Sequence, residues 1–204
     1  SSDELGSIFY SDGHGHVTAF QMHDALREDA AAVVAQLAAG GFKVELLSGD
    51  RPQAVAEAAR AAGIATWHGG QRPDQKIARL EELKVQGRRV LMVGDGINDA
   101  PALASAHASM SPATAADISQ TTADAIMQGR TLSGVADALS VANASHRLAL
   151  QNFAIAIIYN IIFVPLAMAG HVTPLIAAIA MSASSITVTA NAVRLKAMRL
   201  ELKA

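Results

Sequence analysis

The chain has 204 residues, and its 16 Lys and Arg nearly balance its 18 Asp and Glu, for a formal net charge of −2. This balance excludes the basic surface of nucleic-acid-binding proteins, and the length allows one large or two modest domains. The chain has no cysteine, which excludes disulfides and thiolate metal sites built by this chain alone. Apolar residues make up 51%, yet residues 148–193 contain no Asp, Glu, Lys or Arg, so the excess of apolar residues belongs to that segment.

The first part of the chain resembles the end of a preceding domain. It begins without Met and without the basic and apolar stretches of a signal peptide, so we interpret the chain as a piece of a longer protein. Apolar residues alternate on both sides of an Asp-Gly-His-Gly turn at 12–15, which predicts a β-hairpin over residues 7–22. His14 and His16 flank this turn, and because such a pair more often faces solvent than a metal, we assign neither a role.

Residues 24–147 alternate between predicted helices and strands. Apolar side chains recur at helical spacing from residue 30, and further helices are predicted to begin at Pro52 and Pro73, where proline is favoured. Short apolar runs predict buried strands at 44–47, 64–67, 90–93, 108–110 and 125–127. Because strands alternate with helices, we predict a doubly wound parallel α/β sheet.

Three polar segments lie at the ends of these predicted elements, where parallel sheets bind ligands. The first, Ser48-Gly49-Asp50, offers a hydroxyl and an open backbone N–H to phosphoryl oxygens. The second, Asp74-Gln75-Lys76, offers the positive charge of Lys76 near a helix start. Taken singly, such a tripeptide is more often a turn and such a lysine more often faces solvent. The third segment is more specific.

That third segment reads Gly-Asp-Gly-Ile-Asn-Asp-Ala-Pro over residues 94–101. A dinucleotide-binding fingerprint would need glycine where Asp99 stands, and a Walker A loop would need a Gly-Lys-Ser/Thr sequence that the chain lacks. A structural turn needs neither a second carboxylate nor Asn98. The carboxylates of Asp95 and Asp99 are hard oxygen ligands suited to Mg²⁺.

These three segments, together with the continuation Ala-Leu after Pro101 and in this order along residues 24–147, closely resemble the phosphorylation domain of P-type ATPases, a branch of the haloacid-dehalogenase-like hydrolases. The resemblance implies a pump in which ATP phosphorylates an aspartate, and the aspartyl phosphate drives alternating access for a cation. The family's nucleophile lies in an Asp-Lys-Thr-Gly-Thr motif, which this chain lacks. Most of a nucleotide-binding domain is also missing, apart from its last hairpin at 1–23. We therefore expect a C-terminal part of a pump that is inactive alone.

The resemblance also implies roles for single residues. Asp95 and Asp99 match the carboxylates associated with Mg²⁺, the implied cofactor. Ser48 stands where many members have threonine, and the hydroxyl is retained. The implied catalytic residues are Ser48, Gly49, Asp50, Lys76 and Asn98. ATP is the implied substrate and is bound mainly by the nucleotide-binding domain outside this chain.

Two apolar stretches, 148–170 and 174–193, are each long enough to cross a hydrocarbon core of about 30 Å. Basic residues precede the first and follow the second, in a tail at 194–204, whereas the loop between them carries no fixed charge. This distribution predicts that both ends of the segment face the cytoplasm. We expect a multi-pass protein of the bacterial plasma (inner) membrane, in contact with the lipid bilayer.

Polar residues inside such spans tend to face a protein interior or a transport pathway. Tyr159 and Asn160 lie in the middle of the first span, and Met181, Ser184 and Ser185 share a face of the second. Methionine sulfur suits Cu⁺, whereas Zn²⁺ favours His, Cys or a carboxylate. The spacing is equally compatible with small residues that allow close helix packing and a methionine that fills space.

Tyr-Asn at 159–160 and Met-Ser-Ala-Ser-Ser at 181–185 resemble the signatures of copper-transporting heavy-metal ATPases. The implied Cu⁺ site is lined by Tyr159, Asn160, Met181, Ser184 and Ser185, with a Cys-Pro-Cys motif supplied by an earlier span. Residues 186–195 resemble copper pumps linked to cytochrome oxidase assembly. The implied partners are the rest of the same pump and a copper chaperone or a cytochrome oxidase assembly factor.

Several alternatives stay open at this point. A pump for Zn²⁺ or Cd²⁺ remains, because the Cys pair that discriminates between metals lies outside the sequence. A membrane-tethered phosphatase of the same superfamily would need its own nucleophile, and Asp12 and Asp24 lack the motif around them. A noncatalytic membrane module would leave Ser48, Lys76 and Asp95 without a purpose. His68 and His171 have no assigned role.

Overall fold

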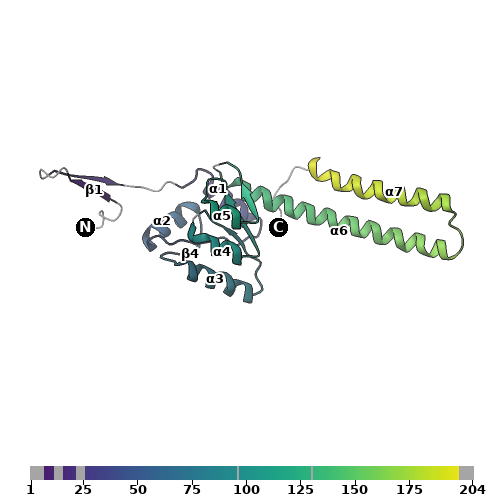
Figure 1. The fold of residues 1–204 in the computed structure, drawn as a ribbon, viewed down its shortest axis with the longest axis horizontal. Helices are drawn as coiled ribbons and strands as arrows, with labels where there is room; N and C mark the ends of the chain where they lie inside the picture. Colours follow the sequence, from purple (N-terminus) through teal and green to yellow (C-terminus); the bar gives the residue numbers. More distant parts are fainter. Residues whose placement is uncertain (1–6, 12–15, 22–25, 96, 130, 198–204) are drawn as a thin grey trace.

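The computed structural model describes residues 7–11, 16–21, 26–95, 97–129 and 131–197 (Figure 1). Its first element is the predicted hairpin: strands β1 (Ser7–Ser11) and β2 (Val17–Gln21) pair antiparallel. His14, Asp12, Asp24 and residues 198–204 of the predicted basic tail lie outside the described residues.

The α/β part follows the predicted order of elements. The first half contains α1 (Ala30–Ala39), β3 (Glu45–Leu47), α2 (Pro52–Ala62), β4 (Thr66–His68) and α3 (Pro73–Val85). The second half contains β5 (Leu91–Val93), the 3₁₀ turn η1 (Ile97–Asp99), α4 (Ala100–Ser105), β6 (Ala108–Pro112), α5 (Asp117–Thr122) and β7 (Ala125–Met127). Proline opens α2 and α3 as expected, and Gly63 ends α2 at φ 75°, a conformation that glycine adopts without strain.

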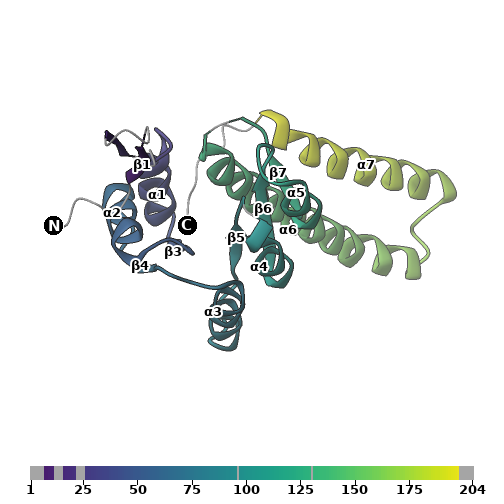
Figure 2. The same ribbon diagram turned by 60° about the vertical axis from the view of Figure 1, so that its left-hand side comes forward.

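The strands are parallel, as predicted, but they form two sheets. β3 pairs with β4, and β5, β6 and β7 pair in that order. Figure 2 shows the first sheet beside α1 and α2, and the second beside α4 and α5. The sequence predicted one continuous sheet, and this prediction is wrong for the described residues. The sheet is divided between β3 and β5 because no described strand lies between them and pairs with both.

Apolar side chains from both sequence halves form the core. Leu80 of α3 packs with Met92 of β5 and with Ala102 and Leu103 of α4. A second cluster joins Met110 and Met127 of the three-stranded sheet to Val135. Val135 belongs to α6 (Ser133–Met168), so the first turns of this long helix are part of the domain core.

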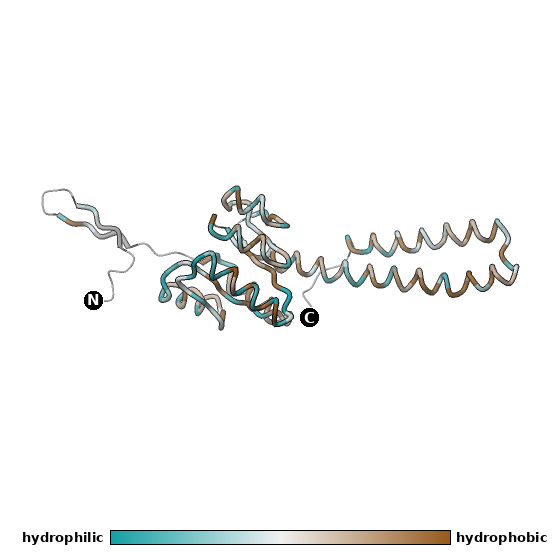
Figure 3. The backbone as a smooth tube through the Cα atoms, turned by 60° about the horizontal axis from the view of Figure 1, so that its bottom comes forward, coloured by the Kyte–Doolittle hydropathy of each residue, from teal (hydrophilic) through white to brown (hydrophobic). Residues whose placement is uncertain are grey.

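Two helices then form the predicted hairpin. α6 has 36 residues and continues without interruption from the core, and α7 (Pro174–Val193) runs back beside it, ending in the 3₁₀ turn η2 (Arg194–Ala197). At 1.5 Å per residue α6 is about 54 Å long. Both helices are long and apolar enough to cross a membrane (Figure 3). The spans predicted at 148–170 and 174–193 correspond to the outer part of α6 and to α7.

A cluster of amide side chains joins the two helices of the hairpin. The side chain of Asn191, 8% exposed, donates to Asn152 at 2.9 Å and to Gln151 at 3.4 Å. Arg194 donates to the Asn191 amide oxygen at 3.0 Å. Hydrogen bonds of this kind fix the register of helices in a membrane, because a buried amide without a partner is costly there.

Candidate functional site

The centre of the candidate site is an ion pair between α3 and the turn that follows β5. Lys76 Nζ lies 2.6 Å from Asp99 Oδ1, and their side chains are only 9% and 14% exposed. Pro73 starts α3, so Lys76 sits in its first turn, while Asp99 closes η1 directly before α4. The solvent-facing interpretation of Lys76 is therefore wrong: the lysine is buried and holds one oxygen of a carboxylate.

Gly94 allows Asp99 to come this close to the strand end. A Cβ placed on Gly94 would lie 2.8 Å from Asp99 Cβ and 3.1 Å from Asp99 Oδ2. Real Cβ atoms essentially never approach other atoms so closely, and Asp99 is itself held by Lys76. The glycine at this position is thus required for the ion pair.

We predict that Gly94→Ala pushes Asp99 away and exposes Lys76. Labelling with acetic anhydride followed by peptide mass spectrometry should show Lys76 modified about tenfold faster, since a solvated amine reacts while a buried, paired one is protected. Gly134→Ala is the matched control, because its Cβ would meet Met127 at an ordinary 3.5 Å. Equal labelling of Lys76 in the Gly94→Ala variant and the unmodified protein would contradict this assignment.

Asp95 follows the carboxyl end of β5, in the same loop as Asp99 of this ion pair. Its side chain and that of Asn98 are exposed, and its backbone oxygen accepts a hydrogen bond from the Ala116 N–H at 3.2 Å. The exposed Asp95 carboxylate and the second Asp99 oxygen are the hard donors that Mg²⁺ prefers. In the part of the chain that the structure describes, no three His, Cys, Asp or Glu side chains gather in a ready metal site, so a bound Mg²⁺ would need further oxygens from substrate or water.

The Ser48 segment is a tight turn after β3. Ser48 Oγ donates to Asp50 Oδ2 at 2.8 Å and accepts from the Asp50 N–H at 3.2 Å. Its backbone is tied to β4 and to the entry of α3: the Ser48 N–H donates to the His68 oxygen, and Gln71 N–H donates to the Ser48 oxygen. Gly49 and Asp50 are exposed, so this turn presents polar groups to solvent beside the start of α3.

Asp74 plays a different part from its neighbour Lys76. Its carboxylate receives two hydrogen bonds from the Arg72 guanidinium, at 3.2 and 3.1 Å, and is exposed. The Arg72 hydrogen bond lowers the pKa of Asp74 below its ordinary value. Gln75 caps the helix by accepting from the Arg72 N–H at 2.9 Å, so Asp74 and Gln75 stabilise the start of α3 and Lys76 faces the interior.

The predicted membrane residues differ in how far the hairpin buries their side chains. Tyr159 and Ser184 are half-buried. Tyr159 lies seven residues after Asn152 on α6, and Ser184 lies seven residues before Asn191 on α7. Because Asn152 and Asn191 contact each other, Tyr159 and Ser184 lie at the same level along the hairpin. Tyr159 stacks on Phe163 with ring centroids 4.4 Å apart. Asn160, Met181 and Ser185 are exposed, Asn160 donating to the Ala156 oxygen at 2.9 Å. Three of the five residues are thus exposed on the hairpin and two are half-buried.

Some functional candidates carried no local sequence signal. Arg79 binds Glu45 across 34 positions of sequence, and nothing in either neighbourhood predicts that pairing. Asn191 and Asn152 are polar residues in apolar stretches, so the reasoning that selected Asn160 also applies to them.

A family model described as haloacid dehalogenase-like hydrolase matches residues 3–107 of this chain. Among curated relatives, the nitrogen fixation protein FixI of Bradyrhizobium diazoefficiens is 52% identical over 181 residues, which cover 89% of this chain and 25% of the relative. The copper-exporting P-type ATPase of Bacillus subtilis is 37% identical over 176 residues, covering 86% of this chain and 22% of that protein. The chain thus spans about a quarter of the length of these relatives.

Among solved structures, a zinc-transporting PIB-type ATPase in its E2.Pi state superimposes with a TM-score of 0.79 and 30% identity. The similarity covers 94% of this chain and 32% of that ATPase. It therefore includes the α/β domain and the helical hairpin together, and the order of domain and hairpin is common to both proteins.

Proposed function

We propose that this chain, which belongs to the haloacid dehalogenase-like hydrolase family, is the C-terminal part of an ATP-driven P-type pump that exports Cu⁺. The observation that carries the proposal is the buried ion pair of Lys76 with Asp99, whose loop also carries the exposed Asp95 carboxylate, in a domain continuous with a membrane hairpin through α6. Chemistry on a phosphoryl group and movement across a membrane are thereby joined in one chain.

The residues of the site suit the transfer of a phosphoryl group to an aspartate. Lys76 carries a fixed positive charge, and Gly49 and Ser48 offer N–H and O–H donors that stabilise the charge of the phosphoryl oxygens. For Ser48 to donate to a phosphoryl oxygen, its hydroxyl has to turn away from Asp50. Asp95 and Asp99 would hold Mg²⁺, which neutralises phosphate charge when bound.

The nucleophilic aspartate is proposed to come from a segment outside this chain. β3 and β5 each have an edge with no partner strand among the described residues. An extended segment of the same protein, with its carboxyl end near Ser48 and Asp95, fits such an edge because strand edges offer unpaired N–H and C=O groups.

The long helix α6 is the proposed link between phosphorylation and transport. Its Val135 packs against Met110 and Met127 of the three-stranded sheet, and its far half belongs to the membrane hairpin. A displacement of the domain core is therefore transmitted to the hairpin through one uninterrupted helix.

Cu⁺ is the proposed cargo because of the donor atoms in the hairpin. Residues 148–193 contain methionine and no carboxylate or cysteine, and thioether sulfur selects Cu⁺ over Zn²⁺. The relatives named as copper exporters support this choice, whereas the zinc-transporting structural neighbour keeps a divalent cation as the second candidate. Asn160, Met181 and Ser185, which α6 and α7 leave exposed, are proposed to face spans outside this chain, and Tyr159 and Ser184 to line the same site from the interface between the two helices.

We place the pump in the bacterial inner membrane with both ends of this segment in the cytoplasm, on the charge distribution of the sequence. The resemblance to pumps linked to cytochrome oxidase assembly supports a copper chaperone or an oxidase assembly factor as partner.

The proposed cargo is tested by measuring ATP hydrolysis of the purified full-length protein with Cu⁺ or Zn²⁺ added. We expect stimulation by Cu⁺, and stimulation by Zn²⁺ alone would overturn the choice of cargo.

Met181→Leu in the full-length protein should lower the number of tightly bound Cu⁺ ions. It should also lower the rate of Cu⁺-stimulated ATP hydrolysis by about tenfold, because the thioether ligand is lost while the volume of the side chain is kept. Bound copper is measured after gel filtration. Met168→Leu, at an 85% exposed position at the end of α6, is the matched control. Unchanged copper binding in the Met181→Leu variant would remove Met181 from the site.

A further inference from the structure

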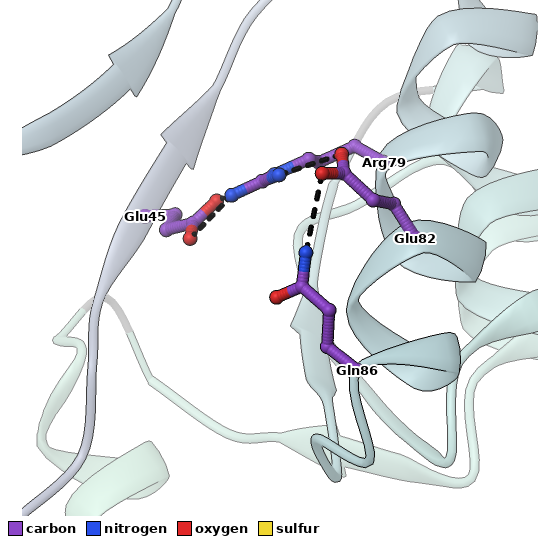
Figure 4. Close-up of polar contacts among 4 residues, drawn as sticks. All are labelled: Glu45, Arg79, Glu82 and Gln86. Atoms are coloured by element: carbon purple, nitrogen blue, oxygen red, sulfur yellow. Dashed lines mark hydrogen bonds and ion pairs between the residues drawn. The ribbon is translucent and has the colours of Figure 1, made fainter.

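Arg79 makes an unusually complete set of contacts. Its Nε and Nη2 donate to the two carboxylate oxygens of Glu45, at 3.1 and 3.0 Å, and its Nη1 donates to Glu82 at 2.7 Å (Figure 4). Gln86 donates to the other Glu82 oxygen at 3.2 Å and so holds that carboxylate in place. The Arg79 and Glu45 side chains are 23% and 20% exposed, a partly buried, two-pronged ion pair of the kind that fixes geometry as well as charge.

This ion pair connects the two sheets of the domain. Glu45 begins β3 of the two-stranded sheet. Arg79 belongs to α3, which packs through Leu80 on β5 and α4 of the other half. No strand of one sheet pairs with a strand of the other in the described ranges. The contact between Arg79 and Glu45 therefore connects the two-stranded sheet to the half of the domain that contains the three-stranded sheet.

Each residue of the ion pair between Glu45 and Arg79 lies close in the sequence to a residue of the candidate site. Glu45 begins β3, and Ser48 follows directly after the last residue of this strand, about 10 Å further along the chain. Arg79 follows Lys76 by three residues, so both side chains project from neighbouring positions of one face of α3. One turn of α3 therefore makes two ion pairs: Lys76 binds Asp99, and Arg79 binds Glu45.

We propose that Glu45 and Arg79 are a positioning pair that sets the separation between the Ser48 turn and Lys76, so that both reach the same phosphoryl group. This inference rests on the proposed function. Neither residue touches the phosphoryl group. The pair acts by holding β3 at a fixed distance from α3, and misplacement of a catalytic group by about 1 Å costs up to about 100-fold in rate. The hydrogen bonds from Arg79 to Glu45 and Glu82 raise the pKa of Arg79 further above its ordinary value, so this guanidinium stays charged at every physiological pH.

The test compares Arg79→Ala, Arg79→Lys and Glu45→Gln in the full-length protein. We expect Arg79→Ala and Glu45→Gln to slow phosphoenzyme formation from ATP by about 10- to 100-fold with KM for ATP within about twofold. KM is spared because ATP is bound mainly outside this chain. Arg79→Lys keeps the positive charge but loses the planar guanidinium that donates two hydrogen bonds to Glu45, and it should give an intermediate rate of phosphoenzyme formation. Melting temperature and gel filtration establish the folded fraction to which each rate is referred.

Lys84→Ala is the matched control, since it breaks the 2.7 Å ion pair between Lys84 and Glu81, whose two partners both belong to α3. It should leave the rate unchanged. Folded Arg79→Ala protein that is phosphorylated at the normal rate would overturn the inference, and if Arg79→Ala does not fold, a normal rate in Glu45→Gln overturns it. Failure of the unmodified full-length protein to form any phosphoenzyme would refute the proposed function instead.

Discussion

Replacing Lys76 with methionine should lower phosphoenzyme formation in the full-length pump by about 100- to 1,000-fold, the usual loss when one donor to a developing anionic charge is removed. It should also destabilise the protein by about 3–5 kcal/mol, because Asp99 is left buried without its 2.6 Å partner. Phosphorylation is measured with radiolabelled ATP, and stability by thermal unfolding in detergent.

A double variant separates these two effects. Lys76→Met combined with Asp99→Leu removes both charges, so most of the stability should return while phosphorylation stays lost. Lys84→Met, a change at the partly exposed lysine of the same helix, serves as control and should leave both quantities unchanged. Normal phosphorylation in folded Lys76→Met protein would show that the buried lysine is a structural residue only.

Asp95→Asn, unlike Lys76→Met, should cause a large loss of phosphorylation without a loss of stability. The Asp95 side chain is exposed, and surface substitutions of this kind change the free energy of unfolding by about 0.5 kcal/mol or less. Loss of a Mg²⁺ ligand should nevertheless lower phosphoenzyme formation by about 100-fold or more and raise the Mg²⁺ concentration that gives half the maximal rate.

Asp74→Asn is the matched control for this prediction. Asp74 is also an exposed carboxylate, but it binds Arg72 at the start of α3, and its removal should leave the Mg²⁺ dependence unchanged. If Asp95→Asn and Asp74→Asn behave alike, the Asp95 carboxylate has no special relation to Mg²⁺.

The sequence predicted those features of the fold that depend on local chemistry. Pro52 and Pro73 open helices, because each proline acts on its own backbone. The membrane hairpin follows from length and absence of charge alone. The short helices α4 and α5 were not predicted, since six residues offer too little periodicity to read.

Features that depend on distant partners were beyond local reasoning. Lys76 is buried because Asp99, 23 positions away, lies opposite it, and α3 alone gives no sign of this. The division into two sheets and the pairing of Arg79 with Glu45 likewise arise from tertiary contacts. In the hairpin, the sequence selected Tyr159 and Met181, but which face each occupies depends on the register that Asn191 sets.

The most direct test of the account is to locate the phosphate on the full-length protein after incubation with Cu⁺, Mg²⁺ and radiolabelled ATP. We expect an acid-stable, hydroxylamine-sensitive acyl phosphate that forms only with Cu⁺ present and lies on an aspartate outside these 204 residues. An acyl phosphate on an aspartate within this chain, or no acyl phosphate at all, would contradict it.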